Sequence, residues 1–190
     1  MKAPVNVVVK VLWQAAAHLL AYPDERFWRR LPLIREAAEP YFAGFLDRAA
    51  ELGAGELAAH YVETFDLDRR CCLYLTYYAD GDTRRRGASL AALKRRYRAA
   101  GWELMEDELP DFLPVVLEFA ALDAAGAEVL REHRVGLELL RVALEGRGSP
   151  YALVVGAVCG TLPPATAEQR AEVRRLAAGG PPAESVGRQA

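Results

Sequence analysis

Apolar residues recur at helical spacing along almost the whole chain, and this periodicity constrains the fold more than any other feature of the sequence. In residues 111–122, Phe112, Val115 and Phe119 share one helical face, and Pro114 sits in the first turn, where its missing N–H is harmless. No segment alternates convincingly between apolar and polar residues, as a half-buried strand would. The sequence therefore predicts an all-α fold, a single-domain helical bundle of about eight or nine helices.

Proline, glycine and aspartate mark the expected helix ends. Asp24 is expected to cap the second helix, Pro40 to close it, and Gly101 to end a long helix that Asp82 caps. The expected helices cover about residues 7–21, a short piece with its apolar residues at 27–34, and then 41–52, 55–65, 71–78, 82–100, 111–122, 127–144 and 151–159.

The chain divides into one domain and a tail. Residues 1–162 are expected to form a single helical domain, since a length of 190 residues suits one compact core. From residue 163 onward the sequence is rich in alanine, glycine, proline, arginine and glutamate. Residues 163–190 are therefore expected to form a weakly helical or disordered C-terminal tail, with at most a weak helix near 167–177.

The composition argues against several classes of function. With 24 basic and 26 acidic residues, the net charge of −2 gives no general attraction to nucleic acid. No apolar run reaches the roughly 18 residues that a membrane-spanning helix requires. Residues 4–11 are apolar, but Asn6 and Lys10 interrupt them and no cleavage site follows, which is unlike a signal peptide. We expect a cytoplasmic protein with no nucleic-acid partner and no direct membrane insertion.

The sequence carries few residues for catalysis. His18, His60 and His133 lie far apart along the chain, and no metalloprotease, nucleophile-elbow or phosphate-loop motif is present. We therefore expect no catalytic residue, no metal site and no cofactor. Two alternatives from other classes remain open: a small helical enzyme that works through carboxylates or a bound metal, and a helical transcription regulator.

The three cysteines do not form a metal-binding or redox motif. Cys71 and Cys72 are adjacent, Cys159 is distant, and no CxxC spacing occurs. All three have apolar neighbours in the sequence, so we expect them to be small buried hydrophobic residues.

Charge is segregated in the middle of the chain, where seven basic residues without an acid precede seven acidic residues without a base. Two interpretations remain: solvated faces that pair with each other, or a basic and an acidic surface for different partners. The basic run comprises Arg84, Arg85, Arg86, Lys94, Arg95, Arg96 and Arg98, and the acidic run Glu103, Glu106, Asp107, Glu108, Asp111, Glu118 and Asp123.

Aromatic residues concentrate between residues 61 and 78. At helical spacing, Tyr61, Phe65, Tyr74 and Tyr77 are typical of a core. Tyrosine also carries a polar end and is favoured where a groove accepts an amphipathic helical peptide. The stripe is therefore either core alone or core that also forms the wall of a groove.

The same region resembles a known family. Tyr61-Val-Glu-Thr-Phe-Asp66, Leu73-Tyr-Leu-Thr-Tyr-Tyr78 and Gly81-Asp-Thr-Arg-Arg-Arg-Gly87 are similar to the signature block of the nitrate reductase molybdenum cofactor assembly chaperones. These are the NarJ-like, or delta-subunit, members of the redox-enzyme maturation chaperone family. Leu19-Leu-Ala-Tyr-Pro-Asp24 and Glu108-Leu-Pro-Asp-Phe-Leu-Pro114 resemble two further motifs, so the likeness spans about residues 12–122. Phe112 stands where the family often has a histidine.

The resemblance implies an all-helical chaperone, not an enzyme. Family members are implied to bind the apo catalytic subunit of respiratory nitrate reductase, usually at its N-terminal segment. They hold it competent for molybdenum cofactor insertion and iron–sulfur assembly, and they delay its docking on the membrane subunit. A chaperone for another molybdoenzyme, such as a selenate, sulfoxide or N-oxide reductase, is the alternative within the same class.

The motif positions and the residue chemistry together give a hypothesis for the client-binding groove. Its apolar wall comprises Tyr61, Phe65, Tyr74 and Tyr77; its polar anchors are Asp66, Asp82 and Arg86; and its mobile edge is the turn of Pro110 and Asp111. Asp66 and Asp82 have an equal claim to be helix N-caps, worth about 1 kcal/mol each. The oligomeric state stays open, and an exchange of helices through residues 101–110 is one possibility.

Overall fold

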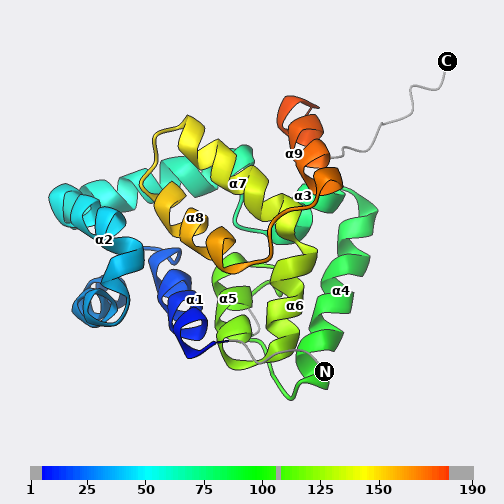
Figure 1. The fold of residues 1–190 in the computed structure, drawn as a ribbon, viewed down its shortest axis with the longest axis horizontal. Coiled ribbons are helices and arrows are strands. Elements are labelled where there is room, and N and C mark those ends of the chain that lie inside the picture. Colours follow the sequence, from blue (N-terminus) through cyan, green and yellow to red (C-terminus); the bar gives the residue numbers. More distant parts are fainter. Residues whose placement is uncertain (1–5, 106–107, 180–190) are drawn as a thin grey trace.

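The computed structural model describes residues 6–105 and 108–179, which form nine α-helices and no strand (Figure 1), confirming the predicted all-α class. A short π-helical turn, η1, and a 3₁₀ turn, η2, connect the second and third helices. The elements are α1 (Val7–Leu19), α2 (Glu25–Tyr61), η1 (Val62–Asp66), η2 (Arg69–Cys71), α3 (Leu75–Asp80), α4 (Arg84–Ala99), α5 (Leu113–Leu122), α6 (Ala124–Glu132), α7 (Arg134–Gly146), α8 (Tyr151–Thr161) and α9 (Ala167–Gly179).

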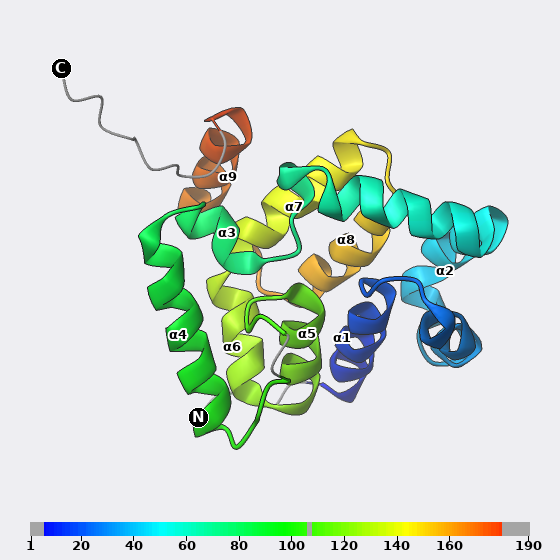
Figure 2. The ribbon, with the colours of Figure 1, turned by 180° about the vertical axis from the view of Figure 1, so that it is seen from behind.

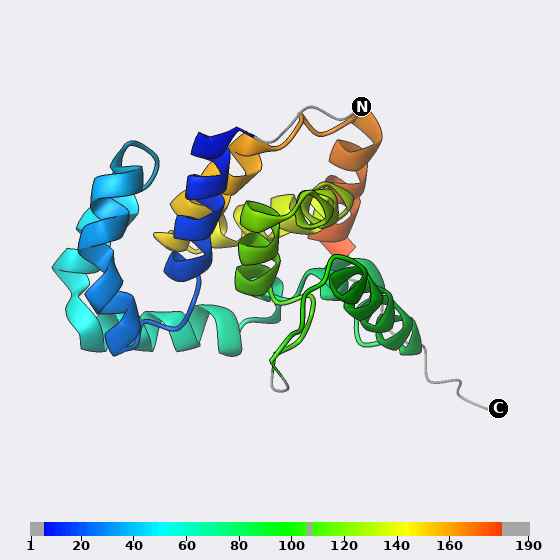
Figure 3. The same cartoon turned by 90° about the horizontal axis from the view of Figure 1, so that it is seen from below.

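The helices form an elongated bundle with α2 at one end and α4 at the other (Figures 1 and 3). Figure 2 shows α4, α6, α5 and α1 following one another across the molecule. Within this array α1 packs on α5 and α5 on α6, while α7 packs on both α8 and α9. One large core joins these helices, and the indole N–H of Trp13 donates to Thr161 Oγ1 at 2.8 Å, which ties α1 to α8.

A smaller aromatic cluster attaches α4. Tyr97 of α4 stacks on Phe119 of α5 with ring centroids 4.3 Å apart, and Trp102 meets the same ring edge-on. Gly101 then ends the predicted long helix with φ of +80°, a conformation that glycine adopts at no steric cost.

The sequence predicted three helices, with breaks at Pro40 and between residues 52 and 55, and the 37-residue α2 consists of helical pieces joined across kinks close to both places. Asp24 caps α2 as predicted and accepts from the N–H groups of Arg26 and Phe27. The breaks persist as kinks: Ala38, just before Pro40, and Gly53 have non-helical dihedrals. The first kink lies two residues before Pro40, whose ring and missing N–H oppose a straight helix, and the second lies at a glycine with a φ of +71°.

The helix predicted for residues 71–78 is wrong in its first half. There the chain is a 3₁₀ turn followed by an extended segment, and α3 begins only after it. The N–H of Leu113 donates to the carbonyl of Leu73 at 2.8 Å, and Tyr74 pairs with Phe112 in an antiparallel bridge. A partner distant in sequence therefore satisfies this backbone, and local periodicity carries no sign of that.

The predicted cap of α4 is also wrong. α4 begins at Arg84 with Thr83 as its N-cap residue, and Asp82 instead pairs with Arg69 at 3.2 Å. The predicted helix 127–144 is two helices, α6 and α7, because the backbone leaves helical geometry at His133.

α9 covers the residues predicted as a weak helix at 167–177. It packs on α7, and its Leu176 belongs to the main core. The boundary expected at residue 162 stays a prediction, and residues 180–190, assigned to a disordered tail, lie outside the described part of the chain. In residues 6–105 and 108–179, no helix is both long and apolar enough to cross a membrane. The cytoplasmic location stays a prediction.

Candidate functional site

The residues of the predicted groove fall in separate places. Two of them, Tyr61 and Phe65, lie in the interior, and Asp66 is exposed at the end of η1. Four others meet at the junction of α3, α4 and α5: Tyr74, Arg86, Pro110 and Asp111. The last two lie near a pocket, which Tyr77 lines together with Arg69, the ion-pair partner of Asp82.

Tyr61 and Phe65 belong to an aromatic cluster inside the main core. The ring of Phe65 lies 4.8 Å from that of Tyr61 and 4.8 Å from that of Tyr151, which is fully buried. The hydroxyl of Tyr61 donates to the carbonyl of Leu20 at 3.3 Å, and burial raises the pKa of this phenol well above its usual value. Of the two interpretations of the aromatic stripe, the structure favours core for these two rings.

Asp111 is completely buried, and it anchors the start of α3. Its Oδ2 accepts from the hydroxyl of Thr76 at 2.5 Å and from the Thr76 N–H at 3.2 Å. The guanidinium of Arg86 lies 3.7 Å from the same oxygen and donates to Thr76 Oγ1 at 3.2 Å. Within the described residues, Oδ1 has no hydrogen-bond partner. One carboxylate thus joins α3 and α4 to the segment before α5.

The segment expected to be a mobile edge is therefore packed into this junction. Pro110 is buried like Asp111, and its carbonyl accepts from the hydroxyl of Tyr97 at 3.2 Å. Phe112, at the place of the family's histidine, lies 5.3 Å from the half-buried ring of Tyr74. The guanidinium of Arg86 covers that ring at 5.6 Å, a cation–π contact.

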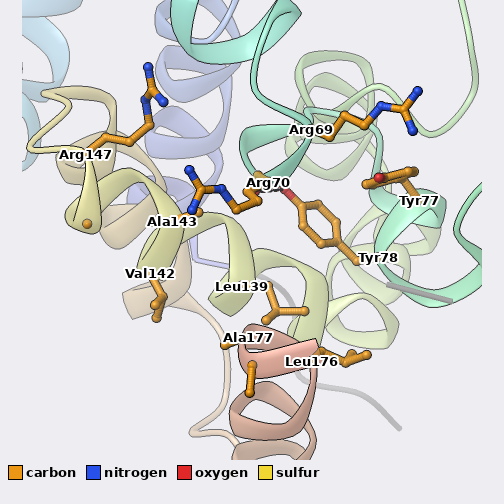
Figure 4. Close-up of a pocket in the computed structure, with 12 residues that line it drawn as sticks. Arg69, Arg70, Tyr77, Tyr78, Leu139, Val142, Ala143, Arg147, Leu176 and Ala177 are labelled. Carbon is orange, nitrogen blue, oxygen red and sulfur yellow. Dashed lines mark hydrogen bonds between the residues drawn. The ribbon is translucent and has the colours of Figure 1, made fainter. Parts of the chain in front are cut away.

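A pocket of about 560 Å³ lies between α3, α7 and α9 (Figure 4). Tyr77 and Tyr78 of α3, Leu139 and Val142 of α7, and Leu176 of α9 give it apolar walls. Helical spacing on α7 brings residues 139, 142 and 143 to one face, so this wall is continuous. A cavity of this size accepts part of an apolar side-chain cluster from another chain.

Three basic residues line this apolar space on the side away from α9. Arg69 and Arg70 come from η2, and Arg147 follows α7 (Figure 4). Asp68 accepts from both Arg70 and Arg147, at 3.1 and 2.7 Å, and these bonds hold its pKa below the usual value. Arg69 pairs with Asp82. Three guanidinium groups thus share two carboxylates, which leaves the pocket rim with a net positive charge.

Tyr78 is the best-fixed wall of the pocket. Its hydroxyl donates to the carbonyl of Cys72 at 2.8 Å and, with the longer arm of a shared hydrogen bond, to the carbonyl of Arg70 at 3.1 Å. A Cβ at Gly136 of α7 would stand 3.2 Å from the Tyr78 ring, so the two helices touch closely here. Tyr77, in contrast, is only half-buried.

Sequence reasoning found Tyr77 but missed the rest of this pocket. Leu139, Val142 and Leu176 look like ordinary core positions, and the pairing of Asp68 with Arg147 joins residues far apart in the chain. A helical wheel of α7 shows an apolar face, yet nothing in it tells that the face is incompletely covered. The signal that was available was the pair Arg69 and Arg70, directly before the aromatic block.

The cysteines and the metal-ligating side chains of the described residues form no further site. The three cysteines are free, Cys71 and Cys159 are buried as predicted, and Cys72 is partly covered. Burial raises the pKa of Cys71 to about 11 and that of Cys159 to about 12, which keeps them as unreactive thiols. Within residues 6–105 and 108–179, no group of three metal-ligating side chains is placed to hold an ion.

Members of the basic run pair both with the acidic run and with other acidic residues, and Glu106 and Asp107 of the acidic run lie outside the described part of the chain. Arg86 of the basic run pairs with Asp111 of the acidic run, whereas Arg96 pairs with Glu132 of α6 and Arg85 lies 4.0 Å from Asp80. None of the described residues of the two runs lines the pocket.

Comparison with known proteins places this arrangement in a family. The model of the nitrate reductase delta subunit matches residues 25–155, which include α2 to α7 and the start of α8. The chain belongs to the nitrate reductase delta subunit family. The resemblance noted in the sequence motifs is thereby confirmed.

Relatives in this family match most of the chain. The protein of Bacillus subtilis that is named "Probable nitrate reductase molybdenum cofactor assembly chaperone NarJ" is 35% identical over 153 residues, 75% of this chain and 83% of its own. The nitrate reductase molybdenum cofactor assembly chaperone NarJ of Escherichia coli K12 is 31% identical over 150 residues, 73% of this chain and 64% of its own.

Two further matches differ from these relatives in length or in sequence identity. The nitrate reductase-like protein NarX of Mycobacterium tuberculosis is 41% identical over 157 residues. The match covers 80% of this chain but only 24% of the length of NarX. A solved structure described as a redox enzyme maturation protein from Archaeoglobus fulgidus has a TM-score of 0.65 at 19% identity. It covers 84% of this chain and 94% of its own, and it shows the fold alone.

Proposed function

We propose that this protein is an assembly chaperone of respiratory nitrate reductase that binds the apo catalytic subunit before the molybdenum cofactor is inserted. The observation that carries this proposal is its similarity to NarJ of Bacillus subtilis over 75% of the chain. The described residues support it, because their pocket combines apolar walls with a basic rim and suits binding better than catalysis. The protein acts as a binding partner, not an enzyme.

The client segment docks at the pocket between α3, α7 and α9. Tyr77 is half-buried there and offers a flat apolar surface with a polar end to a helical peptide. Arg69, Arg70 and Arg147 stand at the rim and contact acidic side chains of that peptide. In this proposal the N-terminal segment of the catalytic subunit is the docked part. The contacts of Asp111 with Thr76 and Arg86, at the junction of α3, α4 and α5, hold α3 in position.

Such a chaperone needs a higher affinity for the empty client than for the loaded one. A client segment that folds on binding loses conformational entropy, so its affinity stays moderate and release stays possible. The same binding keeps the subunit open for cofactor insertion and iron–sulfur assembly and delays its membrane docking. The chain itself carries no cofactor in this proposal.

Titration calorimetry of the full chain tests this function directly. The titrant is a synthetic peptide copied from the N-terminal segment of the host's nitrate reductase catalytic subunit. We expect saturable one-to-one binding with a negative ΔCp, because apolar surface is buried. The variant Tyr77→Ala should bind about tenfold more weakly, and Tyr41→Ala, which removes an exposed tyrosine of α2, should bind like the original chain.

Other results would contradict parts of the proposal. Equal binding by Tyr77→Ala would place the peptide elsewhere on the chain. Binding of a peptide from a selenate, sulfoxide or N-oxide reductase in place of the nitrate reductase peptide would change the client. No binding of any peptide or of the full apo subunit would reject the chaperone function.

A further inference from the structure

α9 is attached to the rest of the chain by a small contact. Within Ala167–Gly179 only Leu176 is buried, and Val173 packs partly against the same core. α7, the helix beneath it, is of equal length but buries six residues. A helix of 13 residues is marginal by itself in water, so the docked state of α9 depends largely on one leucine.

α9 covers the pocket without filling it. Ala177 and Ala178 are its other contributions to the lining, and their side chains are the smallest that an apolar helix face can present. The pocket of about 560 Å³ remains open between these alanines and the wall of Tyr77 and Leu139 (Figure 4). A helix with larger apolar side chains would bury more surface at the same place.

α9 also does not neutralise the positive charge of the pocket rim. Its Glu172 pairs with Arg175 of the same helix at 2.6 Å, and the described helix contains one more basic residue than acidic residues. The rim of three arginines and two aspartates keeps its net positive charge beside it. The surface is thus complementary to a helix with bulky apolar residues and a net negative charge, whereas α9 presents alanines and carries two acidic and three basic residues.

We propose that α9 is an intramolecular competitor that occupies the client-binding face of α7, and that an acidic, amphipathic client helix displaces it. This inference rests on the proposed function and adds a gate to it. The preferred client segment has two or more bulky apolar residues spaced three or four apart and at least one acidic residue near them. In the free chain, docked α9 lowers the apparent client affinity by the fraction of molecules in which the face is covered.

Substitutions in α9 of the full chain test the competition in both directions. Leu176→Ser removes the anchor of α9 and should raise the affinity for the client peptide roughly five- to tenfold, as expected when about nine molecules in ten are covered. Ala177→Leu places a larger side chain toward the pocket and should lower the affinity. Ala171→Ser introduces the same serine at an exposed position of α9 and should leave the affinity unchanged.

Hydrogen exchange shows the displacement itself. On addition of the client peptide, amides of residues 170–179 should exchange faster, while amides of residues 137–146 in α7 should exchange more slowly. A peptide whose aspartates and glutamates are replaced by asparagine and glutamine should bind more weakly and displace α9 less.

The outcomes separate this inference from the function on which it rests. Peptide binding that is equal in all three variants would overturn the competition and leave the chaperone function standing. A lower affinity in Leu176→Ser, or greater protection of α9 in the complex, would make α9 part of the client site and overturn its role as competitor. Absence of binding in every chain would reject both.

Discussion

The contact between α5 and α6 and the contact between α7 and α9 represent two extremes of packing in one small molecule. At the first, a Cβ built on Gly126 would lie 2.4 Å from the backbone nitrogen of Ala120, so the two helices meet with no space for a side chain. At the second, Leu176 is the buried residue of α9 and an open pocket adjoins it. The tight contact specifies the fold, whereas the loose one leaves a pocket, which we propose as the docking site of the client.

The largest effect is expected from breaking the tight contact. Gly126→Ala forces the backbones of α5 and α6 apart and should lower the free energy of unfolding by about 3 kcal/mol. Urea denaturation followed by circular dichroism measures the change. Gly55→Ala in α2, where a Cβ meets nothing within 4 Å, is the matched control and should raise stability by about 0.5 kcal/mol. A Gly126→Ala chain as stable as the original would show that the helices can separate freely.

A somewhat smaller effect is expected at the buried carboxylate that positions the pocket wall. Asp111→Asn removes the charge that faces Arg86 and weakens the bond from Thr76, which should cost about 2 kcal/mol. Urea denaturation gives the stability and peptide titration the affinity, which should fall because α3 carries Tyr77. Asp82→Asn, at an exposed ion pair with Arg69, should cost about 0.5 kcal/mol or less. Equal losses in the two variants would contradict the special role of Asp111.

A smaller effect on stability is expected from removal of the Tyr78 hydroxyl, which fixes one wall of the pocket. Tyr78→Phe keeps the ring against Gly136 but leaves the carbonyl of Cys72 without its donor, and we expect a loss of about 1 kcal/mol in stability. Thermal unfolding is the measurement. Tyr22→Phe, at a half-exposed ring that meets the ring of Tyr61 edge-on, serves as the control and should have no measurable effect. An unchanged melting temperature in Tyr78→Phe would mean that the ring alone fixes this wall.

The smallest expected effect is the loss of the stabilising contribution of Asp68 at acid pH. Because hydrogen bonds from Arg70 and Arg147 lower the pKa of Asp68 in the folded chain, its stabilising contribution is present above the unfolded pKa, near pH 4. This contribution is lost as the pH falls through the lower folded pKa. The difference in urea midpoint between the original chain and Asp68→Asn should therefore shrink from pH 7 to pH 3. A difference that stays constant over this range would show that the carboxylate charge plays no part.

The predictable parts of the molecule are those that neighbouring residues decide. Asp24 caps α2 because its side chain reaches N–H groups two and three residues ahead, and Gly101 ends α4 because glycine tolerates a positive φ. The extended segment before α3 was not predictable, since the bond from Leu113 to Leu73 joins residues forty positions apart. Tyr61 and Tyr77 look alike in the sequence, and only their surroundings make one core and the other pocket wall.

The sequence by itself determined that the chain is all-helical, where most helices begin or end, and which family it resembles, because periodicity, capping and motif spacing are local properties. Tertiary structure alone decided that Asp111 is buried against Thr76 and Arg86, that Asp68 joins α7 to the 3₁₀ turn, and that α9 lies on an incompletely filled face. These features depend on how far-separated segments share space, and the free energy of a long-range contact is set by what surrounds it, not by the residues that precede and follow it in the chain.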